Sequence, residues 1–248
     1  MDWSRPVSAV VPGLDGAVLR ALWVRPDELS GAQVHRVAHT GSPEGIRRAL
    51  ARLVQQGMVV RRGSGSAAWY RINTDHVCWP AVEGLFAALD PWRELRRRVE
   101  DLLRDTVRDD AVREEVGVAV VGSTARGDGT AADDLDLLLV VPDRLERWIT
   151  EELLDRLHRD VLRWTGNDAD VHVRTPAQLV ADSTGPTRPA LERWALDAER
   201  LTGPPVHEHL PLVVRPGWSG AARTPDGGAH LPGEGALRRR AGRADLSR

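Results

Sequence analysis

The chain has 248 residues, 42% hydrophobic and 28% charged, so it can bury a core, and wholesale disorder is excluded. Its formal net charge is −2, and all 34 basic residues are arginine because the sequence contains no lysine. This excludes a P-loop NTPase, which needs a phosphate-binding lysine. No apolar run approaches the roughly 20 residues that span a bilayer, and the first residues do not form a secretory signal. We expect a cytoplasmic protein with no membrane partner.

Charge divides the chain into three regions. Residues 1–75 carry 10 arginines and 6 acidic residues, whereas residues 76–205 carry 17 arginines and 26 acidic residues. A basic first region suggests a polyanion-binding module, and an acidic second region suggests a site that gathers cations. Residues 206–248 are rich in proline, glycine and arginine, and we expect a flexible tail there.

Three helices and a strand pair are predicted in residues 1–75. Apolar residues at helical spacing predict helices over 14–25 and 27–39, and Ser42-Pro43 begins a third that ends near Gly57. Two short β-rich segments, 58–62 and 68–72, then flank a Gly/Ser turn. This order of elements resembles a winged helix-turn-helix domain.

The winged-helix resemblance implies that double-stranded DNA is a partner. In that family the third helix enters the major groove and the hairpin contacts the backbone. The residues that match are Arg47, Arg48 and Arg52 for the groove, and Arg61 and Arg62 for phosphate contacts. The alternative is that these arginines form a solvated face in a domain that binds another protein. By analogy with winged-helix regulators, which often dimerise, a homodimer is also expected.

The second region contains a glycine- and acid-rich segment between two predicted strands. A helical connector over 77–107 is redirected at Asp90-Pro91, and apolar runs at 116–121 and 135–141 predict the strands. The first strand ends in Gly122-Ser123 and turns into a short helix, which exposes backbone N–H groups and a hydroxyl to phosphate oxygens. Glycine lets such a phosphate come close, because it has no Cβ.

Two carboxylates begin the second strand. Asp134 and Asp136 are two residues apart, so their side chains project from the same face. Oxygen ligands of this kind suit Mg²⁺ or Mn²⁺. Together with Gly122-Ser123 and the run 125–128 (Ala-Arg-Gly-Asp), this Asp-x-Asp motif resembles the nucleotidyltransferase superfamily of the DNA polymerase beta type, particularly its small bacterial members. Asp133 stands where those members usually carry serine.

The nucleotidyltransferase resemblance spans roughly residues 92–205 and implies a third carboxylate on a neighbouring strand. Asp170 matches that position best, with Asp168 as the fallback. Two divalent ions, Mg²⁺ or Mn²⁺, would then bind the three carboxylates, and Asp170 would also serve as general base. The residues implied to hold the triphosphate of the nucleotide, expected to be ATP, are Gly122, Ser123 and Arg126. Arg126 is equally compatible with a surface position on the helix.

The expected fold class is α+β: a winged helix-turn-helix over residues 1–75, then a connector helix and a small mixed-sheet nucleotidyltransferase domain with flanking helices over 76–205. The expected function is metal-dependent transfer of NMP from an NTP to a hydroxyl-bearing acceptor. The alternative is a DNA-binding transcriptional regulator or an antitoxin, whose nucleotidyltransferase domain senses nucleotide or modifies a partner protein.

Overall fold

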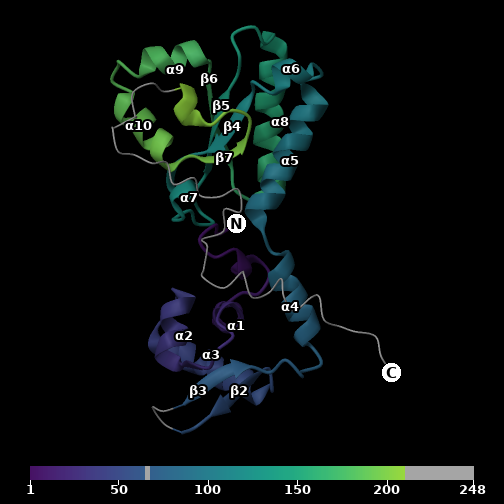
Figure 1. Ribbon diagram of the computed structural model, residues 1–248, viewed down its shortest axis with the longest axis vertical. Helices are drawn as coiled ribbons and strands as arrows, with labels where there is room; N and C mark the ends of the chain where they lie inside the picture. The colour runs from purple at the N-terminus through teal and green to yellow at the C-terminus, as the bar shows by residue number, and fades with distance from the viewer. Residues whose placement is uncertain (65–67, 210–248) are drawn as a thin grey trace. The chain divides into compact units, whose positions relative to one another are not determined.

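The computed structural model describes residues 1–64 and 68–209, which form two compact units (Figure 1). One unit comprises residues 7–90, and the other comprises Met1–Pro6 together with residues 91–209. Both combine helices with a small β-sheet, which confirms the α+β class. None of the helices in the described ranges combines the length and apolar character needed to cross a membrane. The tail predicted over 206–248 lies outside the described residues from position 210 onward.

The unit of residues 7–90 contains four helices and a three-stranded antiparallel sheet of order β1-β3-β2. After a 3₁₀ turn (Pro6–Ala9), its elements are α1 (Leu14–Val24), β1 (Leu29–Ser30), α2 (Gly31–Ala38), α3 (Pro43–Gln55), β2 (Val59–Arg62), β3 (Trp69–Ile72) and α4 (Trp79–Ala88). The second helix begins later than the predicted residue 27, because the two residues before it pair with β3 as a short strand. The third helix and both hairpin strands lie where the sequence predicts them.

Helix α3 shows how the sequence sets its orientation in this unit. The Ser42 hydroxyl accepts a hydrogen bond from the backbone nitrogen of Gly45 (3.1 Å), and Pro43 occupies the first turn. Ile46 and Leu50 are fully buried in the core. The arginines of the helix therefore lie on its exposed face.

The second unit is built on a four-stranded mixed sheet of order β6-β5-β4-β7. Strands β5 and β6 are parallel, and β4 runs antiparallel to both β5 and β7. In chain order its elements are α5 (Pro91–Thr106), α6 (Asp110–Arg113), β4 (Gly117–Val120), α7 (Gly122–Arg126), β5 (Leu135–Val140), α8 (Arg147–Thr165), β6 (Ala169–Arg174), α9 (Pro176–Asp182), α10 (Arg188–Asp197), β7 (Glu199–Thr202) and a 3₁₀ turn (Val206–His209).

Helices cover both faces of this sheet (Figure 1). Helices α5 and α8 pack on one face, against side chains that include Leu137 and Leu139. Helices α9 and α10 pack on the other face, against side chains that include Leu138 and Val140. Because side chains alternate along a strand, Asp136 shares the face covered by α10.

Residues 1–6 belong to the second unit, although 84 residues of the first unit follow them in the chain. Trp3 is buried, and its ring lies 4.8 Å from that of Trp92 between centroids. Its backbone nitrogen also donates to the carbonyl oxygen of Gly129 (3.0 Å). Helix α4 packs Trp79 and Phe86 into the core of the unit of residues 7–90. The domain boundary that the sequence predicts between residues 75 and 76 stays a prediction.

Candidate active site

A glycine turn brings the end of β4 against the start of β5. The strands are antiparallel, and the backbone nitrogen of Val121 donates to the carbonyl oxygen of Asp136 (2.9 Å). Gly122 follows with a φ of +72°, which favours glycine. A Cβ at this position would lie 2.0 Å from Oδ2 of Asp136. Only glycine therefore fits between the turn and that carboxylate as the side chain now stands.

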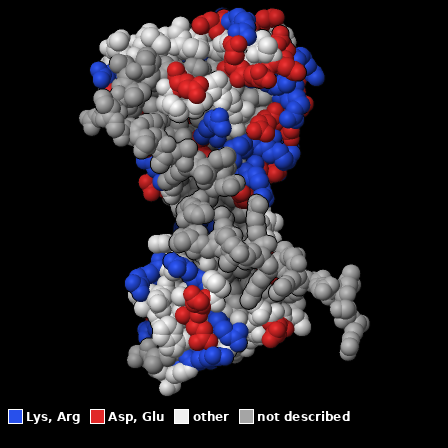
Figure 2. Space-filling model, in the orientation of Figure 1, with Lys and Arg blue, Asp and Glu red and all other residues white. Residues whose placement is uncertain are grey.

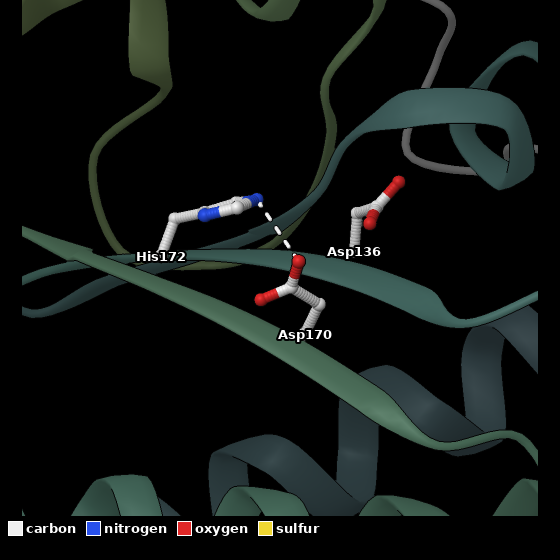
Figure 3. Close-up of side chains that lie close together, drawn as sticks. All are labelled: Asp136, Asp170 and His172. Carbon is white, nitrogen blue, oxygen red and sulfur yellow. Dashed lines mark ion pairs between the residues drawn. The ribbon is translucent and has the colours of Figure 1, made fainter.

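Asp136 and Asp170 are direct register partners on the parallel strands β5 and β6. His172 lies two residues beyond Asp170 and projects from the same face. One ligand atom from each of the three side chains lies within 4.8 Å of the others. Figure 3 shows them rising together from the sheet, with His172 Nε2 3.8 Å from Asp170 Oδ2. Sheet pairing thus brings together three potential metal ligands.

The charges at this site repel one another. Burial is the main cause that raises the pKa of Asp136, and Asp170 and then Asp134 raise it further, while His172 and Arg126 oppose them. Within the described residues, no arginine forms an ion pair with Asp136 or Asp170. Two facing carboxylates and an imidazole are a donor set that fits a divalent cation.

Asp134 occupies an exposed position immediately before β5, and it lies outside the cluster of Asp136, Asp170 and His172. Its neighbour Asp133 forms hydrogen bonds within the loop. The Asp133 carboxylate accepts hydrogen bonds from the backbone nitrogen and the hydroxyl of Thr130, both at 2.8 Å, and these bonds lower its pKa. Asp133 therefore braces the loop that leads to Asp134.

The predicted phosphate-binding residues lie beside the carboxylates. Gly122 and Arg126 line a pocket of about 280 Å³ between α7 and α10, together with Arg193, Trp194 and Asp197. The Arg126 guanidinium lies 3.7 Å from the Asp197 carboxylate. The Ser123 hydroxyl forms no hydrogen bond within the residues that the structure describes, so it is available to a ligand.

Sequence reasoning missed Asn167, which anchors the loop before Asp134. Its side chain is 3% exposed. The amide nitrogen donates to the carbonyl oxygens of Thr130 (3.2 Å) and Asp133 (2.9 Å), and the amide oxygen accepts from the Trp3 indole (3.3 Å). Because Asn167 lies two residues before β6, the strand that carries Asp170, it ties this strand to the loop. The sequence showed only a turn at Gly166-Asn167, with no sign of these partners.

Sequence reasoning also missed His172 and its neighbour Trp194. The spacing of two between Asp170 and His172 is visible in the sequence and places both on one face of a strand. The packing of Trp194 against His172 is not visible, because it joins α10 to β6 across the fold.

The predicted DNA-contacting arginines belong to the other unit, and most of them have acidic partners. Arg47 and Arg48 both pair with Glu44, and Arg52 pairs with Asp15. Arg62 lies 3.2 Å from Glu28, whereas Arg61 forms no ion pair within residues 1–64 and 68–209. All five arginines are exposed. Their role in nucleic-acid binding stays a prediction.

Comparison with known protein families locates the nucleotidyltransferase resemblance in one part of the chain. Residues 100–193 match the family model of the nucleotidyltransferase domain. The match begins within α5, ends within α10 and includes Gly122, Asp136 and Asp170, so it supports the nucleotidyltransferase superfamily for the second unit. Searches of curated proteins and of solved structures gave no match.

Proposed function

We propose that the second unit transfers a nucleoside monophosphate from an NTP to a hydroxyl-bearing acceptor and releases pyrophosphate. The observation that carries this proposal is the facing pair Asp136 and Asp170 within the matched nucleotidyltransferase domain. The two carboxylates are in register, burial raises the pKa of Asp136, and no arginine among residues 1–64 and 68–209 pairs with either, so a cation would relieve the charge of this site.

Each residue has a role in this proposal. Asp136 and Asp170, with Asp134 beside them, would hold the divalent ions, expected to be Mg²⁺ or Mn²⁺. When bound, such ions stabilise negative charge on the transferred phosphoryl group and on the leaving oxygen. Asp170 is exposed and would accept the proton of the acceptor hydroxyl at a carboxylate oxygen.

The turn beside the carboxylates would bind the triphosphate. Gly122 allows close approach of backbone N–H groups, and the Ser123 hydroxyl has no partner to give up within the described chain. Arg126 would exchange its exposed pairing with Asp197 for a phosphate, since a pair at 3.7 Å in solvent contributes little. ATP is the expected nucleotide.

Labelled nucleotide tests the transfer reaction. Full-length protein is incubated with α-labelled NTPs, divalent ion and cell lysate, and both label transfer and pyrophosphate release are measured. Asp134→Ala and Asp136→Ala should lower turnover by about 10³-fold or more, because metal-assisted charge stabilisation is lost. Asp155→Ala is the matched control, since Asp155 is an exposed aspartate on α8 and lies outside the carboxylate cluster. Normal turnover in folded Asp136→Ala would refute the proposal.

We further propose that the unit of residues 7–90 is a winged helix-turn-helix module that binds double-stranded DNA. Three helices, a hairpin and exposed arginines on α3 support this reading. The acidic partners of Arg47 and Arg48 are exposed side chains, and such pairs exchange readily for phosphates. This module fits the alternative function, in which a DNA-binding regulator or antitoxin uses the nucleotidyltransferase domain to sense nucleotide or modify a partner protein.

Fluorescence anisotropy with duplex DNA tests the winged-helix proposal. Arg47→Gln with Arg48→Gln should weaken binding severalfold and reduce the salt dependence of the affinity by about one unit of slope per lost phosphate contact. Arg97→Gln with Arg104→Gln is the control, because these arginines also have acidic partners but lie on α5 of the other unit. Equal loss in both double variants would show nonspecific charge attraction only.

A further inference from the structure

His172 presents an imidazole edge to the two facing carboxylates. Its Nε2 lies 3.8 Å from Asp170 Oδ2, and one ring nitrogen lies within 4.8 Å of ligand atoms on both Asp136 and Asp170. Figure 3 shows the ring on the same side of the sheet as both carboxylates. The side chain is 31% exposed, so an ion can reach it from solvent.

The ring of His172 is held in place without using its nitrogen atoms. It stacks on the indole of Trp194, with centroids 4.9 Å apart and planes 28° from parallel. Neither nitrogen forms a hydrogen bond within the described residues. The ring of His158, by contrast, contacts the carbonyl oxygen of Leu154 at 2.8 Å. A fixed imidazole with open nitrogens is oriented for a ligand that lies between it and the carboxylates.

We propose that His172 is a direct ligand of the divalent ion held by Asp136 and Asp170, and that it shifts this site toward a first-row transition-metal ion. The proposal rests on the proposed function and concerns which ion the site selects. Mg²⁺ takes oxygen ligands almost exclusively, whereas imidazole nitrogen favours transition-metal ions. The two carboxylates balance the charge of one dication, and an imidazole nitrogen adds a third donor atom without adding negative charge.

Trp194 is the positioning residue for this ligand. It contacts the His172 ring and also lines the pocket with Gly122, Arg126 and Asp197. The stack therefore sets the angle at which the imidazole meets the ion. Trp194→Leu keeps an apolar side chain but removes the flat ring on which the imidazole stacks, so it should weaken transition-metal binding less than loss of the imidazole itself.

Titration of the full chain with Co²⁺ and with Mg²⁺, in the absence of nucleotide, tests the proposal. Calorimetry gives both affinities, and the visible absorption of bound Co²⁺ reports nitrogen ligation. His172→Ala should lower the Co²⁺ affinity by about tenfold or more and the Mg²⁺ affinity by less than about threefold. His172→Asp should shift the preference toward Mg²⁺, because it makes the donor set all oxygen. His158→Ala is the matched control and should change neither affinity.

The controls separate this proposal from the proposed function. Asp136→Asn and Asp170→Asn should lose both ions, and circular dichroism checks that every variant is folded. If these two variants lose both ions while His172→Ala retains the wild-type ratio of affinities, the role of His172 is overturned and the carboxylate site stands. If the wild-type chain binds no Co²⁺, or if the aspartate variants bind both ions normally, the metal site itself is refuted.

Discussion

The exposed face of α5 and the paired strands β5 and β6 differ in how their charged side chains are arranged. On α5 opposite charges lie next to each other, whereas on β5 and β6 two carboxylates face each other. On α5, acidic and basic side chains alternate along the surface (Figure 2): Glu94 bonds to both Arg97 and Arg98, which lowers its pKa to about 2. At β5 and β6, Asp136 faces Asp170, and the pKa of Asp136 is raised by burial and by that neighbour. The first surface pairs opposite charges in solvent, whereas the second retains negative charge that stabilises only a bound cation.

The largest expected effect comes from filling the space between the turn and Asp136. Gly122→Ala combines a positive φ with a Cβ 2.0 Å from the Asp136 carboxylate. We expect a loss of about 2–4 kcal/mol in the free energy of unfolding and a metal affinity reduced by about tenfold or more. Urea unfolding and calorimetry measure the two effects.

Gly127→Ala is the matched control for that change. Gly127 has a φ of +93°, but nothing lies within 4 Å of a Cβ added there. It should lose only about 1–2 kcal/mol, from backbone strain, with metal affinity preserved. Equal loss of metal affinity in both variants would contradict the role assigned to the close approach at Gly122.

The anchor at Asn167 should have the next largest effect. Asn167→Ala leaves the Trp3 indole and two backbone carbonyl oxygens without their partner, at a cost of about 2–3 kcal/mol. Because the freed loop carries Asp134, turnover should fall as well. The control is Asn73→Ala in the other unit, which removes a hydrogen bond donated to Gly57 and one accepted from the backbone nitrogen of Asp75, and should cost about 1–2 kcal/mol. Unchanged stability of Asn167→Ala in urea would contradict its assignment as an anchor.

A smaller effect is expected from Asp136→Asn in the absence of divalent ions. The pKa of Asp136 is raised in the folded state, so its stabilising contribution belongs to the protonated form and is lost as pH rises through the folded-state pKa. At neutral pH the variant should be more stable than wild type by a few tenths of a kcal/mol, because the site is partly solvated. Thermal unfolding between acid and neutral pH measures this, and a less stable variant would contradict it.

The smallest effect, with the opposite sign, is expected from Glu94→Gln on α5. The pKa of Glu94 lies below its usual value, so its contribution is present above about pH 4.5 and is lost as pH falls toward 2. The variant should be slightly less stable than wild type at neutral pH, and added salt should narrow the difference. Thermal unfolding in low and high salt measures it; a difference that salt does not change would contradict an ionic origin.

Features with a local signal could be predicted from the sequence. Ser42-Pro43 begins α3 because a hydroxyl acceptor and a proline suit the first turn of a helix wherever they occur. The apolar run after Asp134 predicts β5, which carries Asp136 but begins only at Leu135, so Asp134 precedes the strand. The strand that carries Asp170 begins at Ala169. The facing of Asp136 and Asp170 followed from the family resemblance, because a single sequence does not contain the register of distant strands.

Features that depend on distant packing could not be predicted. Strand β1 has only two residues, too few for an alternating hydrophobic pattern. It forms because it pairs with β3 through backbone hydrogen bonds. The stack of His172 on Trp194 joins residues that no local pattern relates. The same holds for Asn167. Its side-chain hydrogen bonds to Trp3, Thr130 and Asp133 all join residues more than 30 positions apart in the sequence.

The docking of residues 1–6 into the second unit has a consequence for how the protein is made. This segment is synthesised before residues 7–90, and the groups that receive it, such as Trp92, Gly129 and Asn167, are synthesised only after them. Residues 7–90 can therefore fold before residues 1–6 have the partners on which they dock. The second unit is thus completed by a segment that precedes residues 7–90 in the chain, and a fragment that starts at residue 91 would lack the contacts of Trp3 with Trp92 and Asn167.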